Sequence, residues 1–231
     1  MHRLPLAGHE PVGDVQADPA VPPSPLKAEH VPYIAMTAGE ESPAPDLVKG
    51  PDGWIAYRTP GPYDRHPGID VLLARTVGTP GGRVDGSRLS ALRQFHCMDL
   101  RRCQGCGKPA THVRRKGTLW VLTEFLETGK PTAIKGPTDM PPSCARCALR
   151  RCPVLEERGR QLLWVRQAPV YGVFADLYPP PGVIVLEQLV PLRNERVMSA
   201  AVATRLVRDL QEVTLADPEF VADLAAQLGR P

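Results

Sequence analysis

Four cysteines stand in two closely spaced pairs whose spacing suits the binding of a metal ion. Cys103 and Cys106 are followed directly by Gly107, and Cys144 and Cys147 repeat the pair after 37 intervening residues. Two residues between thiolates allow one tight turn to direct both sulfurs at one ion, and the glycine supplies the backbone freedom of that turn. Because structural zinc takes four tetrahedral ligands, the two pairs predict a four-cysteine zinc site.

The segments around the pairs leave two arrangements of this site open. A knuckle at 103–107, a strand near Trp120 and a second pair that opens a helix at 148–157 would form a treble clef, in which the helix N-terminus stabilises thiolates. A zinc ribbon, with both pairs on knuckles, is the alternative. In either case four cysteines complete the coordination sphere, so the zinc is predicted to be structural and its binding to be coupled to folding.

Two further cysteines, Cys97 and Cys152, remain outside this set, although all six cysteines lie within 97–152. They are either buried thiols or ligands of a second metal together with His96 or His112. We favour buried thiols, because one zinc site is already complete without them.

Motifs typical of catalysis are missing from the sequence, which contains no HExxH, GxSxG, P-loop or HxE–CxxC deaminase pattern. A nuclease of the HNH type can carry two CxxC pairs on a treble clef, but it needs a histidine pair and an asparagine. Only His112 lies between the pairs, and Asn194 is the one asparagine of the chain. A non-enzymatic role is therefore favoured, and a degenerate zinc-containing nuclease is the weakest alternative.

Positive charge is concentrated around the cysteines. The net charge of the chain is +3, yet residues 87–152 hold 13 Lys and Arg against 4 Asp and Glu. These cations either balance the thiolates or bind nucleic-acid phosphates, and Trp120 and His112 could stack on bases if they are exposed. The candidate nucleic-acid-binding residues are Arg101, Arg102, Arg114, Arg115, Lys116, Arg150 and Arg151.

Two binding functions follow from these features. The first is a zinc-stabilised module that contacts nucleic acid through a basic face around the metal. The second is a protein-interaction or structural module with a purely structural zinc, supported by the proline-rich N-terminal region and by an apolar stripe over 197–210. The target and the oligomeric state are left open.

Two features predict the compartment. Residues 1–14 (MHRLPLAGHEPVGD) lack the apolar core of a signal peptide, and no apolar run approaches the roughly 20 residues that span a bilayer. Grouped cysteines of this kind are typical of metal ligation in a reducing compartment. The sequence therefore predicts a cytoplasmic protein with no membrane partner.

The elements that must position the cysteines are expected to be short. With 27 prolines and 20 glycines, the chain excludes a coiled coil or a helical solenoid, and the mixture of apolar patterns predicts an α+β fold. Helices are predicted over 87–102, 145–159, 194–213 and 218–228, the last one capped by Asp217. Strands are predicted over 54–57, 71–74, 117–124, 161–166, 171–178 and 183–190, the last three as an antiparallel meander.

The chain is expected to divide into a tail and one domain. Residues 1–50 contain nine prolines and no regular apolar period, which predicts a disordered Pro/Ala-rich tail. Within it, only the segment VPYIAM at 31–36 suggests docking on the domain or on a partner. Residues 51–231 are predicted to form a single α+β domain, with the zinc core at 87–160 and C-terminal strands and a helix at 161–231.

The cysteine pairs also carry a resemblance. Residues 103–110 read CQGCGKPA and residues 141–147 read PPSCARC. They resemble actinobacterial and actinophage proteins with a CxxCGxPA … PPxCxxC core, and the likeness covers residues 50–180. The resemblance implies a zinc-binding core in a cytoplasmic bacterial or phage protein. Since no activity is established for that group, it implies no catalytic residues.

Overall fold

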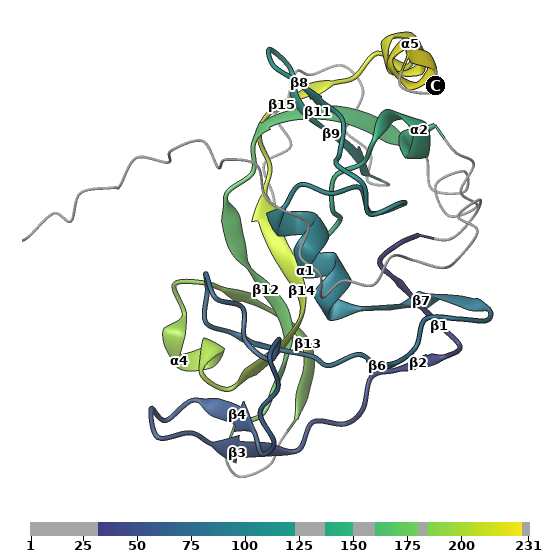
Figure 1. Cartoon of the computed structure of the whole chain (residues 1–231). Helices are drawn as coiled ribbons and strands as arrows, with labels where there is room; N and C mark the ends of the chain where they lie inside the picture. The colour runs from purple at the N-terminus through teal and green to yellow at the C-terminus, as the bar shows by residue number, and fades with distance from the viewer. Residues whose placement is uncertain (1–31, 123–136, 150–159, 180–183, 228–231) are drawn as a thin grey trace, which may run out of the picture.

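The computed structural model describes residues 32–122, 137–149, 160–179 and 184–227. The chain folds there into short, mostly antiparallel strands and a few short helices, so the predicted α+β class is confirmed (Figure 1). Within these residues, no helix has the length and apolar character that a membrane crossing requires.

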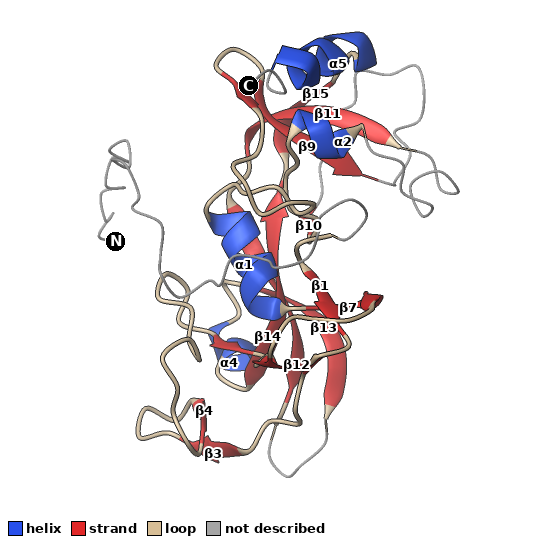
Figure 2. Ribbon diagram, turned by 45° about the vertical axis from the view of Figure 1, so that its right-hand side comes forward, coloured by secondary structure: helices blue, strands red, loops and turns tan. Residues whose placement is uncertain are grey.

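One sheet lies at the end of the molecule that holds the cysteine pairs. Its strands run in the order β15 (Gln211–Leu215), β11 (Gln161–Gln167), β9 (Gly117–Leu122) and β8 (His112–Val113), all antiparallel. Strand β9 is buried along its whole length. Leu119 and Val121 pack in one cluster with α2 (Ala145–Ala148) and α5 (Pro218–Gln227), while Trp120 and Leu122 join the main core. Figure 2 shows both helices beside this sheet. Because both faces are covered, the strand reads as a continuous apolar run.

A second sheet contains β10 (Pro137–Thr138), β14 (Ala201–Asp209), β12 (Val170–Leu177) and β13 (Val185–Pro191), and β5 (Leu72–Leu73) pairs in parallel with β14. Two chain segments pass directly from one sheet to the other, β11 into β12 and β14 into β15. The two segments stay paired on both sides of this passage. Gln167 pairs with Gln211 in the first sheet, and Val170 pairs with Arg208 in the second. The two sheets are therefore joined by one bent, two-stranded ribbon.

Helix α1 (Ala91–Asp99) packs on β14 and carries the chain toward the first cysteine pair. Its buried Gln94 is fixed by backbone partners: Nε2 donates to Leu206 O at 3.0 Å, and Leu206 N–H donates to Oε1 at 2.8 Å. Phe95 and Met98 on the same helix enter the main core. The helix ends in a tight reversal, with Arg102 N–H donating to Cys97 O at 2.9 Å.

The N-terminal part of the described chain forms three small two-stranded ladders. They pair β1 (Ala35–Thr37) with β7 (Val84–Leu89), β2 (Glu40–Glu41) with β6 (Val77–Gly78), and β3 (Leu47–Lys49) with β4 (Ile55–Tyr57). The prediction that the disordered tail extends to residue 50 is therefore wrong for residues 32–50. Ile34, Ala35 and Met36 are buried, and Glu40, which is 2% exposed, forms an ion pair with Arg93. Composition alone does not reveal such long-range partners.

Two helix predictions also need correction. The helix expected over 87–102 begins only at Ala91, because 84–89 pair with β1. The helix expected over 194–213 is wrong: α4 (Glu195–Met198) gives way to β14 and β15. Small apolar residues at helical spacing suggested the helix. In a central strand with both faces covered, however, the period of two is hidden, and the β-branched residues Val202, Thr204 and Val207 suit the strand.

The remaining elements largely follow the predictions. The strands predicted over 54–57, 71–74, 161–166 and 171–178 are confirmed, with shifted ends. Those over 117–124 and 183–190 are confirmed at 117–122 and 185–190, while 123–124 and 183 lie outside the described residues. Helix α5 begins after Asp217, whose Oδ1 accepts the Glu219 N–H at 2.9 Å. Only β12 and β13 form the expected meander pair, because β11 pairs with β9 and β15 instead. The helix predicted over 145–159 is confirmed at 145–148, and its part at 150–159 lies outside the described residues.

Candidate metal centre

The two cysteine pairs meet at one point. The Sγ atoms of Cys103, Cys106, Cys144 and Cys147 all lie within 4.8 Å of one another. Cys103 is fully buried, and the other three are partly exposed. Among the described residues, this is the one group of His, Cys, Asp or Glu side chains that is placed to hold a metal ion.

The first pair sits on a knuckle that the backbone closes by itself. Cys103 N–H donates to Lys108 O at 2.7 Å, and Gly107 N–H donates back to Cys103 O at 2.8 Å. Gly105 N–H points at Cys103 Sγ from 3.3 Å, a contact that stabilises negative charge on the sulfur. Gly107 has φ +69°, a left-handed conformation that favours glycine, in agreement with its predicted role in the turn.

The second pair is held at the start of α2. Cys144 is the residue before the helix, and its carbonyl accepts the Ala148 N–H at 2.9 Å. Thr111 Oγ1 accepts the Ala145 N–H at 2.8 Å, so the helix start is capped from a distant loop. Gln104 N–H donates to Pro142 O at 3.0 Å. That bond ties the loop of one pair to the loop of the other.

The donor set fits a tetrahedral soft-ligand ion. A Zn–S bond of about 2.3 Å in a regular tetrahedron separates neighbouring sulfurs by about 3.8 Å. Cys106 Sγ and Cys144 Sγ are 3.8 Å apart. Four thiolates are also the ligands that zinc takes in closed structural sites, and they leave no position for a substrate.

The crowding of four sulfurs governs their ionisation. Hydrogen bonds from the thiols of Cys106, Cys144 and Cys147 lower the pKa of Cys103 far below its ordinary value. Hydrogen bonds with Cys103, Cys106 and Cys144 raise the pKa of Cys147. The hydrogen bond with Cys103 acts to raise the pKa of Cys144, but those with Cys106 and Cys147 outweigh it and lower that pKa to about 7. The group by itself therefore does not hold four thiolates, because like charges at this distance repel. A bound cation would allow all four to be thiolates.

Cys97 does not belong to this group. It is fully buried on α1, and its Sγ contacts Cys103 O at 3.7 Å. Burial raises the pKa of Cys97 to about 12. The interpretation of Cys97 as a buried thiol is therefore confirmed, whereas Cys152 lies outside the described residues.

The N-terminal segment covers the knuckle, a feature that sequence reasoning left open. Tyr33 N–H donates to Gly105 O at 3.2 Å, and Ile34 N–H donates to Gln104 O at 3.4 Å. A Cβ on Gly107 would lie 3.0 Å from the Tyr33 ring. The apolar segment at 31–36 was the sequence signal for this contact. In the structure, its described residues dock on the chain's own domain.

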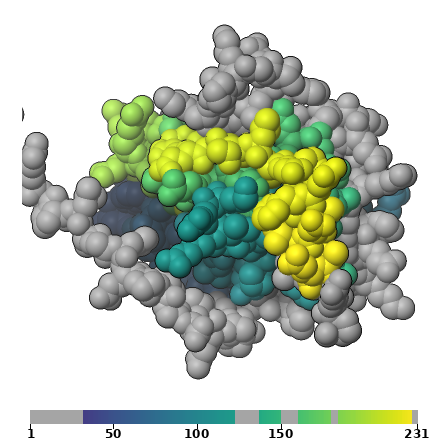
Figure 3. Space-filling view, turned by 90° about the horizontal axis from the view of Figure 1, so that it is seen from above, coloured from purple at the N-terminus to yellow at the C-terminus, as the bar shows by residue number. Residues whose placement is uncertain are grey.

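The predicted nucleic-acid-binding residues have different surroundings. Arg114, Arg115 and Lys116 form the exposed turn between β8 and β9, which reaches the surface beside the C-terminal residues (Figure 3). Arg101 is exposed as well, but the half-buried Arg102 donates to Gly107 O at 3.1 Å and so supports the knuckle. Arg150 and Arg151 lie outside the described residues.

The two side chains suggested for base stacking also differ. Trp120 is 2% exposed in the core, so the suggestion that it stacks on bases is wrong. The other residues of β9 are buried as well. A strand with one exposed face would instead alternate between buried and exposed residues. His112 is exposed, and its Nδ1 lies 3.2 Å from Thr118 Oγ1.

Sequence reasoning missed two further arginines, Arg166 on β11 and Arg208 on β14. Gly117, directly after the β8–β9 turn, lies against the backbone of β11, since a Cβ on it would clash with Val165 O and lie 2.8 Å from Arg166 N. Arg101, Arg166 and Arg208 line one common hollow. We call Arg101, Arg114, Arg115, Lys116, Arg166 and Arg208 together the basic face. The fold brings Arg101, Arg166 and Arg208 to one hollow, and spacing along the chain gives no signal of it.

Comparison with known proteins adds no relative to this description. No protein-family model, no curated protein and no solved structure matches the chain.

Proposed function

We propose that Cys103, Cys106, Cys144 and Cys147 hold one zinc ion in a treble-clef-like unit. The order of elements supports this: a knuckle with the first pair, the β8–β9 hairpin, then α2 with the second pair at its start. In a zinc ribbon the second pair would also lie on a knuckle. Zinc would supply binding free energy that is coupled to folding, and the residues that hold it leave it no catalytic position. Reduced thiolates of this kind suit a cytoplasmic protein.

We further propose that the protein is a non-enzymatic binding protein that contacts nucleic acid through the basic face. The observation that carries the proposal is that six cations come from four separate parts of the chain, which are the end of α1, the β8–β9 turn, β11 and β14. Among the described residues, their ion-pair partners are Asp99, which pairs with Arg208 at 3.2 Å, and Glu212, which pairs with Arg166 at 3.0 Å. Cations in this excess bind phosphates by releasing counterions.

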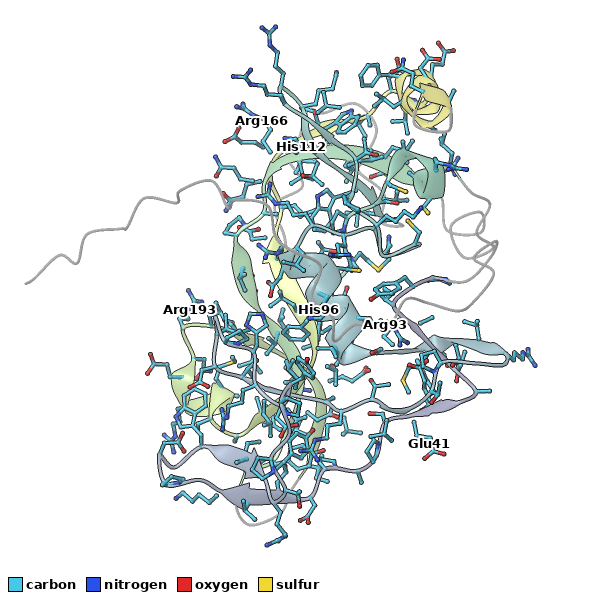
Figure 4. The ribbon with its side chains drawn as sticks, in the orientation of Figure 1. Glu41, Arg93, His96, His112, Arg166 and Arg193 are labelled. Atoms are coloured by element: carbon cyan, nitrogen blue, oxygen red, sulfur yellow. The ribbon has the colours of Figure 1, made fainter. Side chains whose placement is uncertain are left out.

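The binding surface lies beside the zinc unit rather than on the cysteines. His112 and Arg166 lie at the same end of the sheet, whereas Arg193 lies well away from them (Figure 4). Lys116 Nζ lies 5.1 Å from the centre of the Phe220 ring, so the turn also contacts α5. Since β8 and β9 connect the two cysteine pairs, zinc would hold the hairpin that presents the cations.

Fluorescence anisotropy across a salt series tests this function. The zinc-loaded full chain is titrated into labelled duplex DNA, single-stranded DNA and RNA. For duplex DNA, we expect the slope of log affinity against log salt to fall by about 0.9 for each phosphate contact removed, so by about 2.7 when Arg114, Arg115 and Lys116 all become Gln. Arg193→Gln is the matched control and should leave the slope unchanged. No binding to any of the three at low salt would refute the proposal.

A second candidate, protein interaction, is favoured by strand β13. It lies at a sheet edge, and its Leu186 is 62% exposed. Ile184, which directly precedes the strand, is 53% exposed. Such an edge can accept an extended segment of a partner. However, Glu187 has φ +52° and its N–H is bonded to Asp176 Oδ1, which interrupts the edge at its centre. Peptide-display selection against the wild-type chain would test this function, with a Leu186→Glu variant as the comparison. If β13 accepts a partner segment, the selected peptides should bind the wild type and not the variant.

A further inference from the structure

A small hollow lies at the junction of the two sheets, near the end of α1. Its polar lining consists of three arginines, Arg101, Arg166 and Arg208, together with Thr118 and Trp120. The hollow is partly open, and the centre of a water-sized sphere has about 10 Å³ in it, which is room for roughly one water molecule or one oxygen atom of a larger group. These residues come from α1's end, β9, β11 and β14, so the hollow exists only in the folded sheet pair.

Two buried donors in this lining have no acceptor among the described residues. They are Trp120 Nε1 and Arg208 Nε. Trp120 is 2% exposed, so its indole N–H cannot turn to bulk water instead. Buried N–H groups are rarely left unpaired in folded proteins. Both groups belong to residues that line this one hollow, so an acceptor that enters it would lie beside both residues.

Positive charge in the hollow exceeds what its carboxylates balance. Arg208 donates to Ala168 O at 2.6 Å and to Asp99 Oδ1 at 3.2 Å, but Asp99 is shared with His66. Burial and the neighbouring positive charge of Arg101 both lower the pKa of Arg208. The carboxylate of Asp99 acts to raise that pKa but does not outweigh them. Arg101 has no ion pair among the described residues, and Arg166 shares the exposed Glu212.

We propose that this hollow binds one phosphate group. One phosphate oxygen would accept the N–H groups of Trp120 and Arg208, while the outer oxygens would face Arg101 and Arg166. A phosphate suits the set because its oxygens offer several acceptors to planar guanidinium groups. The inference rests on the proposed function for the source of the phosphate, a nucleic-acid backbone. Free phosphate would use the same chemistry.

Arg101 provides a variant whose effect cannot be explained by unfolding. Its φ is +50°, the left-handed region at a helix end, where glycine is the preferred residue. Arg101→Gly should therefore fold with a Tm at or above that of the wild type. If Arg101 contacts phosphate, the same change should weaken phosphate binding about tenfold. Arg193→Gln removes an exposed cation elsewhere and is the matched control.

The test is a ¹H–¹⁵N titration of the zinc-loaded full chain with inorganic phosphate, followed at the indole N–H signals. Trp54 and Trp164 are the internal references. We expect a saturable shift of the Trp120 signal alone, weakened about tenfold by Arg101→Gly and unchanged by Arg193→Gln. A Trp120 signal that does not move, that moves together with both references, or that responds equally in Arg101→Gly would overturn the inference.

A second titration with an unlabelled oligonucleotide separates this inference from the proposed function. If phosphate shifts Trp120 and the oligonucleotide does not bind, the hollow is a free-phosphate site and the proposed function fails. If the oligonucleotide binds wild type and Arg101→Gly with equal affinity, the nucleic-acid function stands and the backbone does not use the hollow. If both ligands shift Trp120 and Arg101→Gly weakens both, the two proposals stand together.

Discussion

Gly105 offers a direct perturbation of the cysteine site that touches no ligand atom. It lies between Cys103 and Cys106, and a Cβ built on it would lie 3.0 Å from both the Cβ and the Sγ of Cys147, and 3.6 Å from Cys103 Sγ. Its backbone is not in the left-handed region, so Gly105→Ala acts through this contact alone. One methyl group would therefore push the second cysteine pair away from the first.

The magnitude follows from the distances. Non-bonded carbon atoms rest at about 3.5–4.0 Å, so the methyl group must displace Cys147 or the knuckle by about 0.5 Å. Metal–ligand distances tolerate only about ±0.2 Å. Disturbing the groups that orient metal ligands costs about tenfold to a hundredfold in affinity, which corresponds to about 1.4–2.7 kcal/mol.

Competition with a chromophoric chelator measures this loss. Zinc-loaded wild type, Gly105→Ala and Gly86→Ala are each titrated with the chelator at one pH. Gly86 is the matched control, since a Cβ at that position meets nothing within 4 Å. We expect the chelator to remove zinc from Gly105→Ala at a tenfold to hundredfold lower concentration and from Gly86→Ala as from the wild type. Equal retention of zinc by all three proteins would refute the claim that the two pairs close on one ion.

Two further predictions concern the cysteines, and a third concerns the buried ion pair of Glu40 with Arg93. Cys106→Ser and Cys144→Ser should each unfold the core in circular dichroism, and a variant that kept one zinc and full thermal stability would contradict the ligand assignment. Cys97, with its pKa near 12, is only about one part in ten thousand thiolate at pH 8, so mass spectrometry should find it unalkylated in the native protein. Burial acts to raise the pKa of Glu40, but hydrogen bonds from Arg93 and Thr37 outweigh it and lower that pKa. Glu40→Gln should therefore cost about 3 kcal/mol in urea unfolding at pH 7, and the difference should shrink as the pH falls below about 4.3.

The candidate metal site could be predicted because its signal is local. Two cysteines two residues apart can face one ion in a single turn, whatever the rest of the chain does. The same holds for Gly107, whose positive φ the turn requires. What the sequence could not supply is the cover over the knuckle, because Tyr33 lies 72 positions before Gly105 and meets it only through the fold.

The failed fold predictions share one physical cause. Strand β14 is buried on both faces, so Ala201, Ala203 and Leu206 show no alternation and match helical spacing instead. The last residues of strand β7, 87–89, were assigned to the helix that follows because pairing with β1 cannot be seen in their own sequence. In both cases tertiary partners decide the local structure, and a single sequence does not display them.

The basic face was only partly predictable for a related reason. Runs of cations such as 114–116 are visible in the sequence, and they occupy the exposed turn that such a run favours. Arg166 and Arg208 lie in strand patterns that otherwise indicate core, and only the folded arrangement of the two sheets and α1 places them at one hollow with Arg101. Arg102 is the opposite case. It was predicted to bind nucleic acid, but its guanidinium donates to the backbone carbonyl of Gly107 and so supports the knuckle.

X-ray absorption at the metal edge of the purified full chain, together with its metal content, tests the central claim most directly. The account predicts one zinc per chain with four sulfur neighbours at about 2.3 Å and no nitrogen or oxygen in the coordination sphere. A coordination sphere with fewer than four sulfurs, or a folded chain that binds no metal, would contradict it.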